Sequence, residues 1–226
     1  MGTDDFFKKK RQARQKRKCE LKIPKANSFL IVTEGAKTEP LYLNGIEKQI
    51  KESIGGRVDV KIIPQIDVHG EGKSTNKLID KTSEIIRKTP ILYQEIWVVF
   101  DKDDFQDFDQ AIERGNTLGY NIAWSNECFE YWAYLHFEYS DAALHRNDWQ
   151  KKLDAIFEKY GLGDGKYSKN NPEIYNLLNT FDGVSTAIKN AKRRMSNFND
   201  TQDKPSLYNP GTKMHVLVEK LLTYVM

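Results

Sequence analysis

The sequence is poor in cysteine and has no long apolar run. Only two of its 226 residues are cysteine, Cys19 in a charged segment and Cys128 in an apolar one, so neither a disulfide framework nor a zinc cluster is indicated. No apolar run approaches the roughly 18 residues that a membrane span needs, and the N-terminus lacks the apolar core of a signal peptide. These absences predict a cytoplasmic protein that does not enter a membrane.

Basic charge is concentrated near the N-terminus. Eight Lys or Arg residues and no acidic residue lie between Lys8 and Lys18, although the formal charge of the whole chain is only +3. Such a segment can neutralise phosphates, which predicts a nucleic-acid partner. The alternative is a solvated tail without a binding role. In either case residues 1–26 lack hydrophobic periodicity and are predicted to be a disordered basic arm.

Strand-like and helix-like segments alternate after this arm. The alternation predicts an α/β fold with a mostly parallel sheet and helices on both faces. From about residue 141 the pattern becomes helical, which predicts a C-terminal helical layer packed on the sheet. The predicted division is an arm at 1–26, an α/β core at 27–140 and a helical part at 141–226. Predicted strands begin at Phe29, Val58, Glu95 and Tyr120, and a loop is predicted at 67–74.

Acidic residues stand at the ends of two predicted strands. Glu34 ends the first, and Asp101 and Asp103 follow the third. Because ligands of open α/β sheets bind where parallel strands end, these carboxylates are predicted to share one crevice. Oxygen ligands favour Mg²⁺ or Mn²⁺ over zinc, and such an ion would hold and activate a phosphodiester. The alternatives are a water-exposed turn at Glu34 and an acidic loop in which Asp104 caps the next helix.

The segment from Asp67 to Ser74 resembles a Walker A loop. It ends in Gly-Lys-Ser before a predicted helix. Asp67, however, stands where the first motif glycine belongs, and a carboxylate there would repel phosphates. An NTPase is therefore the weaker interpretation. A second one keeps His69 and Lys73 as phosphate contacts at the crevice, and the simplest is a glycine-rich loop with a hydroxyl residue as helix N-cap.

Two further segments supply polar candidates. Asn126 and Glu130 follow the fourth predicted strand and start at the same edge of the sheet, where Glu130 could add a metal ligand. His136 lies among apolar residues and is predicted to be a satisfied interior histidine. Near the C-terminus, Thr212 is predicted to cap the last helix and His215 to lie in its first turn.

Four motifs taken together resemble the RloB-like (AbiL-type) family of bacterial defence proteins, which is related to Toprim domains. The resemblance covers roughly residues 28–222 in the same order. One position departs from the family pattern, because Glu127 stands where the family has proline. The motifs are Val32-Thr-Glu-Gly-Ala-Lys-Thr-Glu-Pro40, Val99-Phe-Asp-Lys-Asp-Asp-Phe105, Ser125-Asn-Glu-Cys-Phe-Glu-Tyr-Trp132 with Leu135-His-Phe137, and Asn209-Pro-Gly-Thr-Lys-Met-His215.

The resemblance implies a Mg²⁺-dependent Toprim-like core. Glu34 would be an acid/base or a ligand, Asp101 and Asp103 would be ligands, and Glu39 matches the second family glutamate. It also implies phage defence, often beside an ATPase partner or a restriction system, with nuclease action on tRNA or other nucleic acid.

The leading hypothesis is therefore a metal-dependent nuclease, cleaving RNA or DNA with Mg²⁺ or Mn²⁺. The alternatives are a non-catalytic nucleic-acid-binding or sensor subunit and the NTPase. The basic arm, Arg193 and Arg194 are further candidates for phosphate contacts, although both arginines could be solvated helix residues. Predicted catalytic residues are Glu34, Glu39, Asp101 and Asp103; predicted metal ligands are Glu34, Asp101, Asp103 and Glu130; predicted phosphate contacts are Lys37, His69, Lys73, Asn126 and His215.

Overall fold

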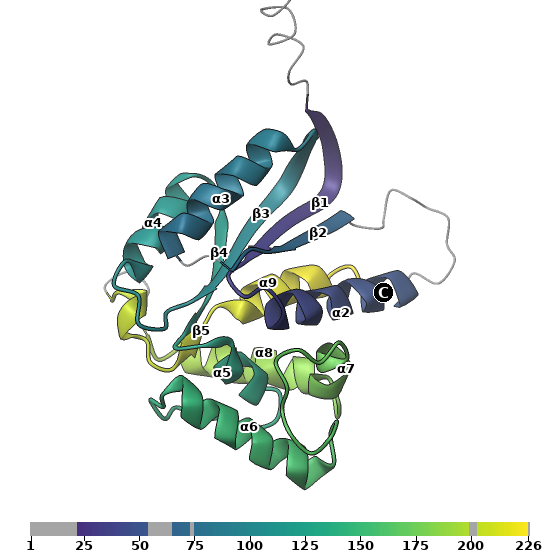
Figure 1. Ribbon diagram of the computed structural model, residues 1–226, viewed down its shortest axis with the longest axis vertical. Coiled ribbons are helices and arrows are strands. Elements are labelled where there is room, and N and C mark those ends of the chain that lie inside the picture. Colours follow the sequence, from purple (N-terminus) through teal and green to yellow (C-terminus); the bar gives the residue numbers. More distant parts are fainter. Residues whose placement is uncertain (1–21, 54–64, 73–74, 199–202, 226) are drawn as a thin grey trace, which may run out of the picture.

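The computed structural model describes residues 22–53, 65–72, 75–198 and 203–225. Its centre is a five-stranded sheet in the order β2-β1-β3-β4-β5 (Figure 1). The first four strands in this order run parallel, and β5 pairs with β4 in the antiparallel direction. The strands are β1 (Ile23–Thr33), β2 (Gln65–Gly70), β3 (Ile91–Asp101), β4 (Asn121–Asn126) and β5 (Gly211–Thr212).

The inner strand β1 is apolar on both faces. Leu30 and Val32 belong to one core cluster, whereas Phe29 and Ile31 belong to the other. Successive side chains of a strand point to opposite faces, so a continuous apolar run is what a parallel strand covered on both sides requires. The sheet is therefore buried between two layers of helices.

Each face of the sheet has its own pair of helices. Helices α3 (Thr75–Lys88) and α4 (Phe108–Thr117) cover one face, and α2 (Thr38–Ser53) and α9 (Met214–Leu222) cover the other (Figure 1). The predicted α/β class, with a mostly parallel sheet and helices on both faces, is confirmed.

The remaining helices extend the core on the α2 and α9 side. Figure 1 shows them as a layer below the sheet, beyond the ends of the strands. Their apolar side chains belong to the same buried cluster as Phe29 and Ile31 of β1. The helices are α5 (Phe129–Tyr134), α6 (Arg146–Tyr160), α7 (Ile174–Leu178) and α8 (Gly183–Met195). The short 3-10 helix η1 (Pro205–Leu207) is separate from this layer and contacts α4.

The second strand differs from the prediction. It runs from Gln65 to Gly70 and pairs with β1 along Ser28–Thr33, so the loop predicted at 67–74 is wrong for 67–70. The reason is that both neighbouring stretches alternate in polarity, and periodicity alone does not choose between them. The strand predicted at 58–64, the basic arm from 1 to 21, and Lys73 lie outside the described residues.

Three element boundaries also differ from the prediction. β1 begins at Ile23 and pairs there with Ile91, upstream of the expected start. The N-cap of α4 is Asp107, so the cap predicted at Asp104 is wrong. The N-cap of α9 is Lys213, although the backbone N–H of Met214 donates to the Thr212 hydroxyl at 3.1 Å. Among the described helices, none has the length and apolar character needed to cross a bilayer.

His136 is a satisfied interior histidine, as predicted. Its Nε2 lies 2.9 Å from the Tyr42 hydroxyl and its Nδ1 lies 2.9 Å from the Trp132 carbonyl oxygen. Because a carbonyl only accepts, the network assigns the proton of the neutral ring to Nδ1. Burial lowers the pKa of His136 to about 4, since a charged ring would lose its hydration.

This histidine makes the fold sensitive to acid. We compare the wild type with His136→Gln. As pH falls from about 6.5 to about 4, we expect the free energy of unfolding of the wild type to fall by about 3 kcal/mol relative to that of the variant. The sign follows because the unfolded chain binds the proton first. Urea unfolding of both proteins across this range measures the difference, and an unchanged difference would show that His136 is not kept neutral by burial.

Candidate active site

Two carboxylates meet where β1 and β3 end. Glu34 directly follows β1, and its backbone N–H donates to the Val99 carbonyl of β3 at 2.8 Å. Its carboxylate accepts a hydrogen bond from the backbone N–H of Asp101, the last residue of β3, at 3.1 Å. The strand register thus brings together two acids that are 67 residues apart in the sequence.

Burial and mutual repulsion perturb both groups. Burial raises the pKa of Glu34 to about 7, opposed by the Asp101 hydrogen bond and reinforced by the charge of Asp103. Burial also raises the pKa of Asp101 well above its usual range, and the carboxylates of Glu39 and Glu130 raise it further. The backbone N–H of Phe129 donates to Asp101 Oδ2 at 2.9 Å and partly offsets this repulsion. Several acids therefore share one enclosed space.

Glu39 enters this space from the first turn of α2. Its side chain is buried, and its carboxylate lies against the backbone of Gly35. Burial raises its pKa, and the charge of Glu130 raises it further. A Cβ atom at Gly35 would lie only 1.9 Å from Glu39 Oε2, so glycine is required there for the carboxylate to keep its position.

Gly35→Ala is expected to displace the Glu39 carboxylate while leaving the fold almost unchanged, because the end of a flexible side chain can move away. We expect a stability loss of below about 1 kcal/mol. Gly70→Ala is the matched contrast, since its Cβ would lie 2.9 Å from backbone atoms of Gly35 and Ala36 and would force the chain to shift. Chemical unfolding measures the stability of both variants. Equal losses of stability would contradict the claim that the Glu39 side chain, and not the backbone, gives way at Gly35.

Glu130 and the loop before α7 complete the site. Glu130 is buried in α5 and forms an ion pair of 2.7 Å with Lys169. Burial tends to lower the pKa of Lys169, but the Glu130 charge outweighs it and the pKa is raised overall. The neighbouring Tyr167 has a buried hydroxyl that finds no hydrogen-bond partner among the described residues. Burial raises its pKa, and the charges of Glu130 and Glu39 raise it further.

Glu39, Asp101, Glu130 and Lys169 line a pocket of about 300 Å³. Lys169 and Tyr167 were not among the residues predicted from the sequence. They come from a loop without periodicity that reaches the site only through the tertiary fold. The pocket is lined by residues 35–39 and by Asp101, Phe129, Glu130, Lys169 and Asn170.

Asp103 lies at the rim of the site. Its φ of 41° places it in the left-handed region, where Asp is tolerated better than most residues. Its carboxylate forms an ion pair of 2.9 Å with Arg146, the first residue of α6, which also contacts Asp104 at 2.9 Å. The charge of Asp103 acts on Glu34, so it is near the cluster, but its carboxylate is engaged by the arginine.

One family model matches this chain along most of its length. A family model described as RloB-like protein matches residues 29–221. The chain belongs to the RloB-like family. Searches of curated proteins and of solved structures each gave no match. The motif-based prediction of the family is therefore confirmed.

The donor set of this RloB-like protein fits a hard divalent cation. Carboxylate oxygens are the ligands that Mg²⁺ and Mn²⁺ prefer, and a cation would relieve the repulsion that raises their pKa values. The unpartnered Tyr167 hydroxyl could bond to a water of such an ion. Within the described residues, however, no three acidic, histidine or cysteine side chains are already arranged as ligands. Glu34 and Asp101 each accept a bond from a backbone N–H instead.

The predicted phosphate contacts are more dispersed. Lys37 is exposed and lines the same pocket as Glu39, and His69 lies in β2, where it pairs with Val32. Asn126 is buried and donates to the carbonyls of Pro205 and Ser206, at 3.2 and 3.0 Å. His215 is in the first turn of α9, as predicted, with Nδ1 3.1 Å from the Thr212 carbonyl. The last two residues therefore support the fold around the site.

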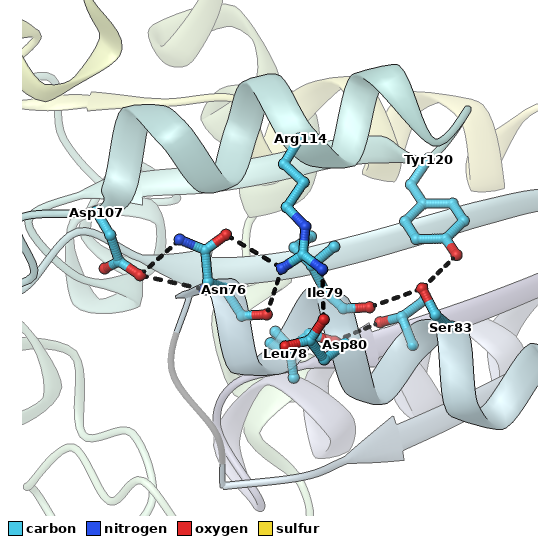
Figure 2. Close-up of polar contacts among 9 residues, drawn as sticks. Asn76, Leu78, Ile79, Asp80, Ser83, Asp107, Arg114 and Tyr120 are labelled. Carbon is cyan, nitrogen blue, oxygen red and sulfur yellow. Dashed lines mark hydrogen bonds and ion pairs between the residues drawn. The ribbon is translucent and has the colours of Figure 1, made fainter.

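The N-terminus of α3, where a Walker A loop would bind phosphate, already holds a carboxylate. Asp107 accepts a hydrogen bond from the Thr75 hydroxyl at 2.8 Å. It also accepts one from the Asn76 side chain at 2.9 Å and a longer one from the Asn76 backbone N–H (Figure 2). A helix N-terminus attracts anions, and here a side chain of the next helix is that anion. Arg114 of α4 adds contacts to Asn76 and Asp80 (Figure 2). This arrangement disfavours the NTPase interpretation.

Proposed function

We propose that this RloB-like protein is a divalent-metal-dependent phosphodiesterase of the Toprim type that cleaves nucleic acid in bacterial defence against phage. The observation that carries the proposal is the gathering of Glu39, Asp101 and Glu130 around one pocket at the ends of β1 and β3, with the Glu34 carboxylate bonded to the backbone of Asp101. Acids that repel one another in an enclosed site cost stability, and a bound cation is the simplest reason to keep them there.

Asp101, Glu34 and Glu130 would hold Mg²⁺ or Mn²⁺, with Asp103 as a fourth carboxylate once it leaves Arg146. When bound, the ion stabilises charge on the phosphoryl oxygens and orients the attacking and leaving oxygens. Glu34 would act either as a ligand or, outside the ligand set, as the acid/base: burial raises its pKa to about 7, so near neutral pH it can take a proton from the attacking group or return one to the leaving oxygen. Glu39, held over Gly35, would support the ligand shell.

Positive charge at the pocket supports a nucleic-acid substrate. Lys37 and Lys169 place positive charge at the pocket, where they would contact phosphates beside the scissile bond. We propose RNA, with tRNA as the leading candidate, or DNA as the substrate, and an ATPase as the controlling partner. The support for the defence role is membership of the RloB-like family.

The test compares cells that express the wild-type chain with cells that express Asp101→Asn, with neighbouring genes present and after phage challenge. The 5′ and 3′ ends of small RNAs are sequenced in both. We expect new ends that depend on Asp101. If neither RNA nor genomic and phage DNA shows such ends, the chain would be a non-catalytic nucleic-acid-binding subunit.

A further inference from the structure

A short series of aromatic rings leads from the core to the surface at the far end of α6. Phe137 contacts the buried ring of Phe157 edge-on, with centroids 6.2 Å apart. Tyr160, the last residue of α6, stacks on Phe137 at 6.1 Å with an interplanar angle of 16°. Phe181 lies against Tyr160 at 5.7 Å and is 74% exposed. We call Phe137, Tyr160 and Phe181 the aromatic platform.

The outermost ring is held in an unusual position. Phe181 and the following Asp182 both have positive φ values, 58° and 60°. Such angles are uncommon for residues other than glycine and are unfavourable for a bulky side chain. A ring that is 74% exposed contributes little to the core, and most of its surface is accessible to a ligand.

The charge beside the platform is mixed, because Asp182 directly follows Phe181 and Glu138 pairs with Lys159, but α8 itself carries only basic charge. Helix α8 begins two residues after Phe181 and contains four Lys or Arg residues and no acid. Lys189 and Arg193 are exposed and, four residues apart, lie on one face of it. The Arg193 guanidinium lies 3.9 Å from the ring centroid of Tyr139, and Lys159 Nζ lies 4.8 Å from that of Tyr160.

We propose that the aromatic platform binds unpaired bases of single-stranded nucleic acid, with α8 contacting the backbone phosphates. Exposed rings interleaved with cations are the usual means of binding single strands, because every base has a π-face that can stack on a ring. A protein partner would be favoured by a wider apolar surface, whereas here one exposed ring precedes a helix that, beyond its N-cap Asp182, carries only basic charge, from Lys189 to Arg194.

Helix α6 connects this platform to the proposed active site. Its first residue, Arg146, contacts Asp103, and its last is Tyr160. Fifteen helical residues place these two ends about 21 Å apart. The platform would therefore hold a strand a few nucleotides from the bond to be cleaved. This inference deepens the proposed function, and its binding component can be tested without cleavage.

The test measures fluorescence anisotropy of a labelled oligouridylate with the full chain in EDTA, which prevents cleavage. We expect Phe181→Ala to weaken binding by about fivefold to about 150-fold, the value of one base stacked on a ring. Phe181→Trp should preserve binding, because it keeps a stacking face. Leu207→Ala is the matched control, since Leu207 is 70% exposed on η1, away from the platform. A blunt duplex should not distinguish Phe181→Ala from the wild type.

The inference is overturned if the wild type does not bind oligouridylate, or if Phe181→Ala binds it as tightly as Leu207→Ala does. Thermal unfolding of each variant shows whether it is folded. Binding that depends on Phe181, without cleavage that depends on Asp101, would support the aromatic platform and contradict the proposed nuclease activity. Cleavage that depends on Asp101, with no effect of Phe181→Ala on binding, would support the nuclease activity and contradict the platform.

Discussion

Asp101→Asn is expected to stabilise the metal-free protein while removing its response to Mg²⁺. The carboxylate is enclosed among other acids, so a neutral amide relieves repulsion and can still accept the bond from the Phe129 N–H. In EDTA we expect the free energy of unfolding to rise by about 0.5–2 kcal/mol, the usual size of a single stabilising substitution. At about 100 times the dissociation constant, Mg²⁺ should stabilise the wild type by about 2.7 kcal/mol and the variant hardly at all.

Asp104→Asn is the control for this experiment. Asp104 is a neighbouring carboxylate, but its side chain is 86% exposed and contacts Arg146 at the surface. Its replacement should change stability by less than about 0.5 kcal/mol, with or without Mg²⁺. Denaturant unfolding of the three proteins provides the comparison. If Asp101→Asn destabilised the metal-free chain, burial of the carboxyl group and repulsion by its neighbours would not be what perturbs this residue.

Glu34→Gln should make metal-free stability less dependent on pH. The folded-state pKa of Glu34 is raised to about 7, so the folded protein holds a proton that the unfolded chain releases at lower pH. As pH rises from about 4.5 to about 7, the free energy of unfolding of the wild type should therefore fall by up to about 3 kcal/mol relative to that of the variant. The opposite contribution of His136 is common to both proteins and cancels.

This difference is measured by urea unfolding of wild type and Glu34→Gln in EDTA at several pH values, and then with Mg²⁺. A bound cation would favour the ionised carboxylate, so Mg²⁺ should remove the loss at high pH in the wild type. A constant difference across the pH range would mean that Glu34 titrates normally and has no special role as a proton carrier.

The sequence predicted the parts of the site that lie at strand ends. Glu34 and Asp101 each follow a short, fully apolar run, and parallel strands end at one edge of a sheet, so their proximity follows from local pattern and topology. The same reasoning correctly placed the helices on both faces. It could not choose the register of β2, because two adjacent stretches alternate and only pairing with Ser28–Thr33 decides.

Other parts of the site depend on contacts that leave no local signal. Lys169 reaches Glu130 from a loop 39 residues further along the chain, and Arg146 reaches Asp103 from the start of α6. Asp107 caps α3 from the beginning of α4, which is a tertiary contact between two helices. Charged side chains in loops and first turns are usually solvated, so sequence alone gives no reason to select these three.

The account depends on whether the carboxylate pocket binds a divalent cation, and titration calorimetry with Mn²⁺ measures this directly. We expect saturable binding to the wild type and to Asp104→Asn with the same affinity. Asp101→Asn should weaken binding by more than the roughly 10-fold to 100-fold that loss of an outer-shell partner costs. Absence of saturable binding to the wild type, or equal binding by Asp101→Asn, would contradict a metal site at the ends of β1 and β3.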